Sequence, residues 1–141
     1  MRRQGALKFT EWDELEPPEL RERDDPNELF ATQCRAFKLP RVERECMFAK
    51  SKLGRRWLFD FAFRDYRLAV EIDGVSVKRL AGQLVVMGRH NSIDGIRGDH
   101  EKINAAILLG WSVLRFLQTD VKPKLAIETT MRVLAARGWK P

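Results

Sequence analysis

Three carboxylates flank the polar tetrapeptide 64–67 in the central stretch of the chain: Asp60 precedes it, and Glu71 and Asp73 follow it. Apolar runs flank this tetrapeptide, a pattern that predicts a β-hairpin. A two-residue turn, the commonest hairpin connection, would place Asp60 directly across from Glu71, with Asp73 one pleat beyond. Like charges that face each other destabilise a sheet, and a divalent cation that prefers oxygen ligands, Mg²⁺ or Mn²⁺, would compensate them. The alternative is that Asp60 and Glu71 pair with arginines or face solvent.

The alternation of side chains along a strand predicts which residues share a face of this hairpin. In the first strand it places four aromatic side chains together: Trp57, Phe59, Phe61 and Phe63. In the second strand Leu68, Val70 and Ile72 are expected to point to one face, and Glu71 and Asp73 to the other.

A further carboxylate, Glu45, precedes the hairpin. Residues 42–51 pass from a charged lead-in to Cys46-Met47-Phe48, which predicts a strand, and the basic turn 52–56 leads into the hairpin. The three strands would form a meander with Glu45 near its mouth, where it would complete a metal-binding cup. Alternatively, Glu45 is a solvent-facing residue of a charge-rich segment.

Composition narrows the class of protein. The chain has 141 residues, of which 44% are hydrophobic and 33% charged, as expected of one globular domain with a sizeable core. Its net charge of +6 favours a polyanionic partner, with nucleic acid as the first choice. No apolar run is long enough to span a membrane or to act as a signal core, so we expect a cytoplasmic or nucleoid-associated protein. Cys34 and Cys46 are expected to be structural thiols, because zinc would need more ligands.

Helices and one further strand are predicted around the meander. Residues 1–25 lack periodicity and are expected to form an arm or extension, followed by a single domain over 26–141. The predicted elements are a helix over 28–37 capped by Asn27, a helix over 99–109, a buried strand over 111–117 and a helix over 123–136. In the last helix Ile127, Val133 and Leu134 are expected to face the core. This order predicts an α/β fold: a mixed sheet made of the three-stranded meander and a crossover strand, flanked by helices.

Residues 74–98 are predicted to form a long connection in which 84–87 have the composition of a short strand. Structureless connections of this length are usually functional or mobile, and a basic loop beside carboxylates can cover a nucleic-acid backbone. A merely flexible loop is the alternative. The candidate DNA contacts here and in the turn before the hairpin are Arg55, Arg56, Lys78, Arg79, Arg89, His90 and Arg97.

The acidic residues, in this order of elements, resemble the motif of the PD-(D/E)XK nuclease superfamily. More narrowly, five segments look like those of small phage endonucleases related to archaeal-type Holliday junction resolvases and to very-short-patch-repair-like nucleases. These segments are Arg56–Ala62, Leu68–Gly74, Gly88–His90, Asp99–Ala106 and Gly110–Phe116, and the likeness covers roughly residues 43–120.

The resemblance implies a restriction-endonuclease-like sheet and a phage-encoded enzyme acting in the host cytoplasm. It also implies Asp60 and Glu71 as metal ligands, Glu45 as the acidic residue of the first helix, and the backbone carbonyl of Ile72 as a further ligand. Asp73 stands where the superfamily has a lysine.

Two residues are candidates to compensate for this missing lysine. Asp73 would be an extra ligand or a base that orients water, and Lys102 would supply the ammonium from a displaced position on the following helix. In the alternative, Lys102 is an exposed helix lysine that pairs with Asp99, one turn away.

The implied activity is Mg²⁺- or Mn²⁺-dependent hydrolysis of DNA phosphodiester bonds. The chain has no recognisable sequence-reading module, which favours structure-specific cutting of branched DNA, as by a Holliday junction resolvase. Symmetrical cuts need two active sites and therefore a homodimer. The alternatives are a mismatch- or sequence-directed nicking enzyme, and a DNA-binding module of the same fold that has lost catalysis.

Overall fold

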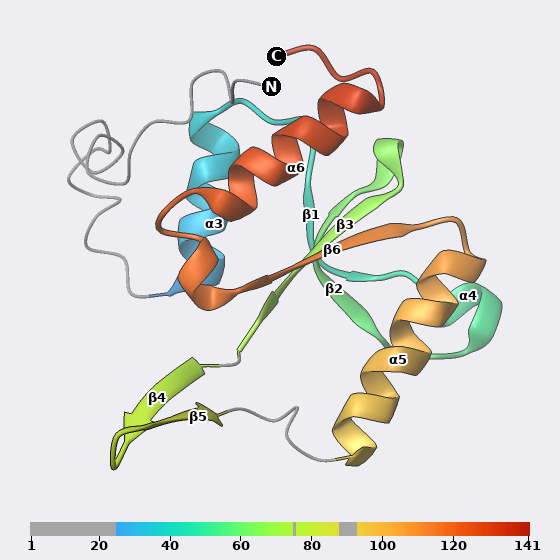
Figure 1. The fold of residues 1–141 in the computed structure, drawn as a ribbon. Helices are drawn as coiled ribbons and strands as arrows, with labels where there is room; N and C mark the ends of the chain where they lie inside the picture. Colours follow the sequence, from blue (N-terminus) through green and yellow to red (C-terminus); the bar gives the residue numbers. More distant parts are fainter. Residues whose placement is uncertain (1–24, 75, 88–92) are drawn as a thin grey trace.

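A four-stranded mixed sheet forms the centre of the computed structural model, which describes residues 25–74, 76–87 and 93–141 (Figure 1). Strands β1 (Glu43–Met47), β2 (Leu58–Phe63) and β3 (Leu68–Asp73) form an antiparallel meander, and β6 (Ser112–Leu117) pairs parallel with β3. The order β1-β2-β3-β6 confirms the predicted meander with a crossover strand.

Helices cover both faces of this sheet (Figure 1). The α3 helix (Pro26–Ala36) and the α6 helix (Leu125–Ala136) lie on one face, and α5 (Ile93–Leu108) and the short α4 (Lys50–Leu53) lie on the other. The fold is therefore an α/β fold with a mixed sheet flanked by helices. Among the described residues, no helix combines the length and apolar character needed to cross a membrane.

The β2–β3 hairpin has the predicted register. The backbone N–H of Arg67 donates to the Arg64 carbonyl at 3.2 Å and closes the turn. The pairs Phe61↔Val70 and Phe63↔Leu68 follow the register that places Asp60 opposite Glu71. Alternating apolar residues and a short turn were sufficient to define it.

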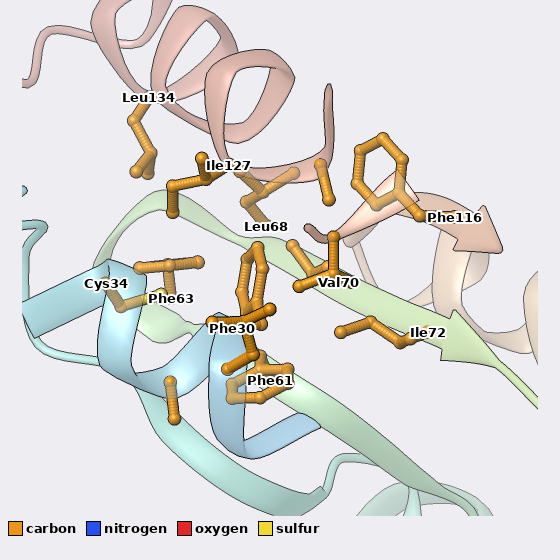
Figure 2. Packing of buried hydrophobic residues seen from close by; sticks show 14 of the residues in the cluster. Phe30, Cys34, Phe61, Phe63, Leu68, Val70, Ile72, Phe116, Ile127 and Leu134 are labelled. Carbon is orange, nitrogen blue, oxygen red and sulfur yellow. The ribbon is translucent and has the colours of Figure 1, made fainter. Parts of the chain in front are cut away.

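The larger core lies between the sheet and the helices α3 and α6 (Figure 2). In Figure 2, side chains from β2 and β3 point toward α3 and α6, and the Phe30 and Phe61 rings pack edge to face with centroids 4.7 Å apart. Ile127 and Leu134 are fully buried in this cluster, as the helical spacing predicted. Leu68, Val70 and Ile72 also point to this face, as expected.

A second cluster lies on the α5 side of the sheet and corrects the predicted faces of β2. Phe59 stacks on Phe48 with ring centroids 3.8 Å apart and packs with Ala62, whereas Phe61 belongs to the opposite cluster. The four aromatic residues therefore do not share a face. The change of face occurs opposite Glu45, whose φ of +51° interrupts the regular pleat of β1.

Several predicted elements differ in extent. The α3 helix is capped by the Asp25 carboxylate, which accepts from the Asn27 N–H at 2.9 Å, so Asn27 is not the cap. The α6 helix begins two residues later than predicted, because Lys124 has a left-handed φ of +66°. The strand β6 is at a sheet edge and only half buried, which corrects the prediction of a buried strand.

The described part of the predicted connection over 74–98 is structured, so the prediction of an irregular loop is wrong for that part. It contains a two-stranded sheet of β4 (Ser76–Leu80) and β5 (Gln83–Met87), and α5 begins at Ile93 rather than at residue 99. The strand suggested for 84–87 is confirmed as part of β5. The predicted arm over 1–25 lies outside the described residues except for Asp25.

Both cysteines are buried and free of disulfides, in agreement with structural thiols. Burial raises the pKa of the Cys34 thiol to about 12, so it is protonated at neutral pH.

Candidate functional site

A small cavity of about 40 Å³ lies between the sheet and α5, near the C-terminal end of β3. It brings together side chains from β2, β3, α5 and β6, and we call it the acidic cleft. Its lining residues are Asp60, Glu71, Ile72, Asp73, Asp99, Lys102, Ile103 and Arg115.

The pair Glu71–Lys102 lies at the centre of the acidic cleft. Lys102 Nζ donates to Glu71 Oε1 at 2.8 Å, and the two side chains are only 17% and 12% exposed. Burial raises the pKa of Glu71, while the Lys102 charge opposes this rise and the Asp60 charge adds to it. Lys102 is therefore not an exposed helix lysine, and its ammonium reaches Glu71.

Asp60 is held in place between the two strands of the hairpin. Its Oδ2 accepts a hydrogen bond from the backbone N–H of Ile72 at 2.8 Å. This contact holds the Asp60 carboxylate on the side of the sheet where Glu71 also lines the cleft, and the Asp60 charge contributes to the raised pKa of Glu71. The predicted juxtaposition of these two carboxylates is thus present in the structure.

Asp73 is paired with Arg115, a cleft residue that sequence reasoning missed. Arg115 Nη2 lies 3.1 Å from each carboxylate oxygen of Asp73 and 3.4 Å from Asp99 Oδ2. The parallel register pairs Arg115 with Glu71, and this places its side chain over the cleft. The only signal in the sequence is an arginine in an otherwise apolar strand, which does not reveal its neighbour.

Glu45 lies opposite Asp60 in the β1–β2 register, but its side chain is not part of the acidic cleft. It is exposed on strand β1, not on a helix, and it is absent from the lining of the acidic cleft. The structure therefore does not bring the expected third carboxylate to Asp60 and Glu71. The resemblance implied that Glu45 lies on a helix, and this is wrong because residues 43–47 form a strand that pairs with β2.

Five of the seven predicted DNA contacts lie within the described residues, and none of these five lines the acidic cleft. The Arg55 guanidinium lies 4.0 Å from the centre of the Trp57 ring and 3.8 Å from Glu101. Arg56 and Arg97 are exposed. Lys78 and Arg79 belong to β4, whereas Arg89 and His90 lie outside the described residues.

The acidic cleft offers carboxylate and carbonyl oxygens, the donor atoms that a hard divalent cation prefers. Among the described residues, no three His, Cys, Asp or Glu side chains are grouped closely enough to hold a metal ion. Mg²⁺, however, commonly uses one or two protein carboxylates and completes its shell with water and phosphate oxygens. Asp60, Glu71 and the Ile72 carbonyl fit this smaller donor set, provided that Lys102 leaves Glu71 when the ion binds.

The fold and the cleft define an α/β protein with a buried, lysine-paired carboxylate beside a second carboxylate. Comparisons with protein-family models, curated proteins and solved structures find no match to the chain. The chemistry of the cleft is therefore inferred from its own residues.

Proposed function

We propose that the chain is a divalent-metal-dependent DNA endonuclease with a restriction-endonuclease-like fold, and that branched DNA is its preferred substrate. The observation that carries this proposal is the convergence of Asp60, Glu71 and Lys102, from three separate elements, on one cleft. Carboxylates can hold a divalent ion that activates water and relieves charge on the phosphoryl oxygens, and a neighbouring ammonium can offset more of that charge.

Five residues of the cleft have a proposed role. Asp60 and Glu71, with the Ile72 carbonyl, would hold the ion, which when bound supplies positive charge for the phosphoryl oxygens and activates water. Lys102 would transfer its hydrogen bond from Glu71 to a phosphate oxygen and offset the negative charge there. Arg115 fixes the position of Asp73, which borders the same space.

Branched DNA is proposed from the resemblance and from the charge of the chain. The net charge of +6 supports contacts with phosphate that do not depend on base sequence. A four-way junction needs two symmetrical cuts, so a homodimer is part of the proposal.

A binding module without catalysis is the second candidate, and the ion pairs of the cleft favour it. Glu71 and Asp73 already have cationic partners in Lys102 and Arg115, so a divalent cation must compete with at least one of them. A protein that only binds DNA could keep these pairs permanently.

A cleavage assay separates these functions. The substrates are an end-labelled four-way junction, a duplex, a mismatched duplex and a single strand, each with Mg²⁺, Mn²⁺ or EDTA. We expect paired symmetrical nicks in the junction with metal and none with EDTA. Cuts at mismatches would favour a nicking enzyme, and binding without cleavage in either metal would favour the binding module.

Substitutions connect the activity to the cleft. Asp60→Asn and Glu71→Gln should abolish cleavage while DNA binding is kept or tightened, because each removes a ligand and a negative charge near phosphate. Asp65→Asn is the matched control, since Asp65 is an exposed acid in the hairpin turn. Normal turnover in either cleft variant would remove that residue from the proposed site.

A further inference from the structure

A two-stranded β-ribbon, formed by β4 and β5, extends away from the body of the protein (Figure 1). The strands pair from Ser76↔Met87 to Leu80↔Gln83 and form a sheet separate from the central one. The ribbon follows β3, which carries Glu71, and precedes α5, which carries Lys102. It is therefore inserted between two elements of the acidic cleft.

The ribbon has a regular hairpin geometry. Its tip consists of Ala81 and Gly82, with φ values of +49° and +79°, and both are exposed. Two successive positive φ values are typical of the tight turn whose twist matches that of paired strands. Ala81 adopts this conformation although a left-handed φ is unfavourable for alanine.

The strand edges of an isolated β-ribbon can form hydrogen bonds with a binding partner. Isolated two-stranded sheets are marginally stable in water, and their edges expose backbone hydrogen-bonding groups. A ribbon that extends from the body gains stability when a partner covers it.

Charge identifies the partner. Between residues 76 and 87 the charged residues are Lys78 and Arg79, and no acid occurs from residue 74 to residue 93. The charge of the ribbon is therefore of one sign, and it suits a polyanion. A second copy of the same basic ribbon would be repelled by it.

We propose that the β4–β5 ribbon enters the major groove of a duplex DNA arm beside the acidic cleft. The major groove is about 12 Å wide and admits a two-stranded ribbon, whose strands lie about 4.8 Å apart. Five-residue strands extend roughly 16 Å, which is enough to follow the groove for about half a helical turn. This inference rests on DNA being the partner, as in the proposed function.

The position of the ribbon has a consequence for cleavage. Because the ribbon is joined directly to β3 and leads to α5, the groove that it occupies determines which phosphate reaches Glu71 and Lys102. The ribbon would thus set the distance between the bound arm and the cut.

Methylation of guanine N7 by dimethyl sulfate tests the groove contact, because N7 lies in the major groove. The experiment uses the full chain with a four-way junction in EDTA, where no cleavage occurs. Wild-type protein should protect guanines in the arms next to the cut sites. A Lys78→Ala/Arg79→Ala variant should lose this protection, and the slope of log K against log [salt] should decrease in magnitude by about 2.

The matched control is Lys122→Ala/Lys140→Ala, which removes the same charge from exposed positions. This control should keep the protection, and circular dichroism should show that both variants are folded. A third variant replaces residues 77–86 by a short Gly-Ser linker and should move or scatter the cuts in Mg²⁺. Protection that is equal in wild type, the Lys78/Arg79 variant and the linker variant would overturn the inference.

The outcomes separate this inference from the proposed function. If protection depends on the ribbon but no metal supports cleavage, the nuclease proposal fails and the ribbon contact stands. If the junction is cut and protection does not depend on the ribbon, the ribbon inference fails alone. If the linker variant loses only a dimer in sedimentation, the ribbon binds a second copy and not DNA.

Discussion

Replacement of Lys102 by methionine tests the central pair of the acidic cleft. The ammonium lies 2.8 Å from the Glu71 carboxylate, and both side chains are more than four-fifths buried. Methionine keeps the apolar stem but leaves Glu71 without its cation and beside Asp60. Removal of one partner from a buried ion pair costs about 3–5 kcal/mol, and we expect the lower limit because some exposure remains. At about 3 °C per kcal/mol for a domain of this size, Tm should fall by about 9 °C.

A divalent cation should replace the missing ammonium if Asp60 and Glu71 form a metal site. At a Mg²⁺ concentration of about 100 times Kd, binding stabilises the folded state by about 2.7 kcal/mol, which would recover most of the loss. In the wild type, Mg²⁺ must first displace Lys102, so its Tm should rise less. Thermal unfolding by circular dichroism, with saturating Mg²⁺ and with EDTA, measures both effects.

Two controls define the refuting result. The Glu71→Gln/Lys102→Met double variant should lose the response to Mg²⁺, because one of the two ligands is gone. Arg64→Met, which removes a 3.0 Å ion pair with Glu43 at the surface, should respond to Mg²⁺ as the wild type does. The same Mg²⁺ response in wild type, Lys102→Met and the double variant would show that the cation binds elsewhere.

Three further predictions concern the cleft and the core. Because the pKa of Glu71 is raised in the folded state, the free energy of unfolding should fall as the pH rises from 4.5 through the folded-state pKa. Glu71→Gln should remove this part of the pH dependence, as measured by urea unfolding at several pH values. Arg115→Met should lower kcat on junction DNA by about 10²-fold with a smaller change in KM, because Arg115 positions Asp73 and Asp99. Arg115→Lys should restore only part of the lost kcat. Phe61→Ala should cost about 3–5 kcal/mol in urea unfolding but leave the activity of the folded fraction intact, because Phe61 packs in the core away from the cleft.

For Glu45 the resemblance and the structure lead to different expectations, since the resemblance implies a catalytic acid and the structure shows an exposed side chain. Its exposed position outside the acidic cleft leads us to expect near-normal cleavage by Glu45→Gln, in contrast to Glu71→Gln. A loss of cleavage comparable to that of Glu71→Gln would mean that β1 moves toward the cleft when DNA and metal bind.

The sequence by itself determined the hairpin and the juxtaposition of its acids. The alternation of apolar residues and the short turn at 64–67 are local features, and together they specify the register that brings Asp60 to Glu71. The same local periodicity identified the core positions of α6, including Ile127 and Leu134. Such features depend only on residues close in the chain.

Only the tertiary structure decided which cations complete the cleft. Arg115 reaches Asp73 because β6 pairs with β3 in one particular parallel register, and Lys102 reaches Glu71 because α5 packs across that sheet. Residues that are close in the sequence do not determine the register of a crossover strand or the rotation of a packed helix about its axis. The change of face between Phe59 and Phe61 likewise lies opposite the left-handed Glu45 on the neighbouring strand, and the periodicity of β2 alone did not predict it.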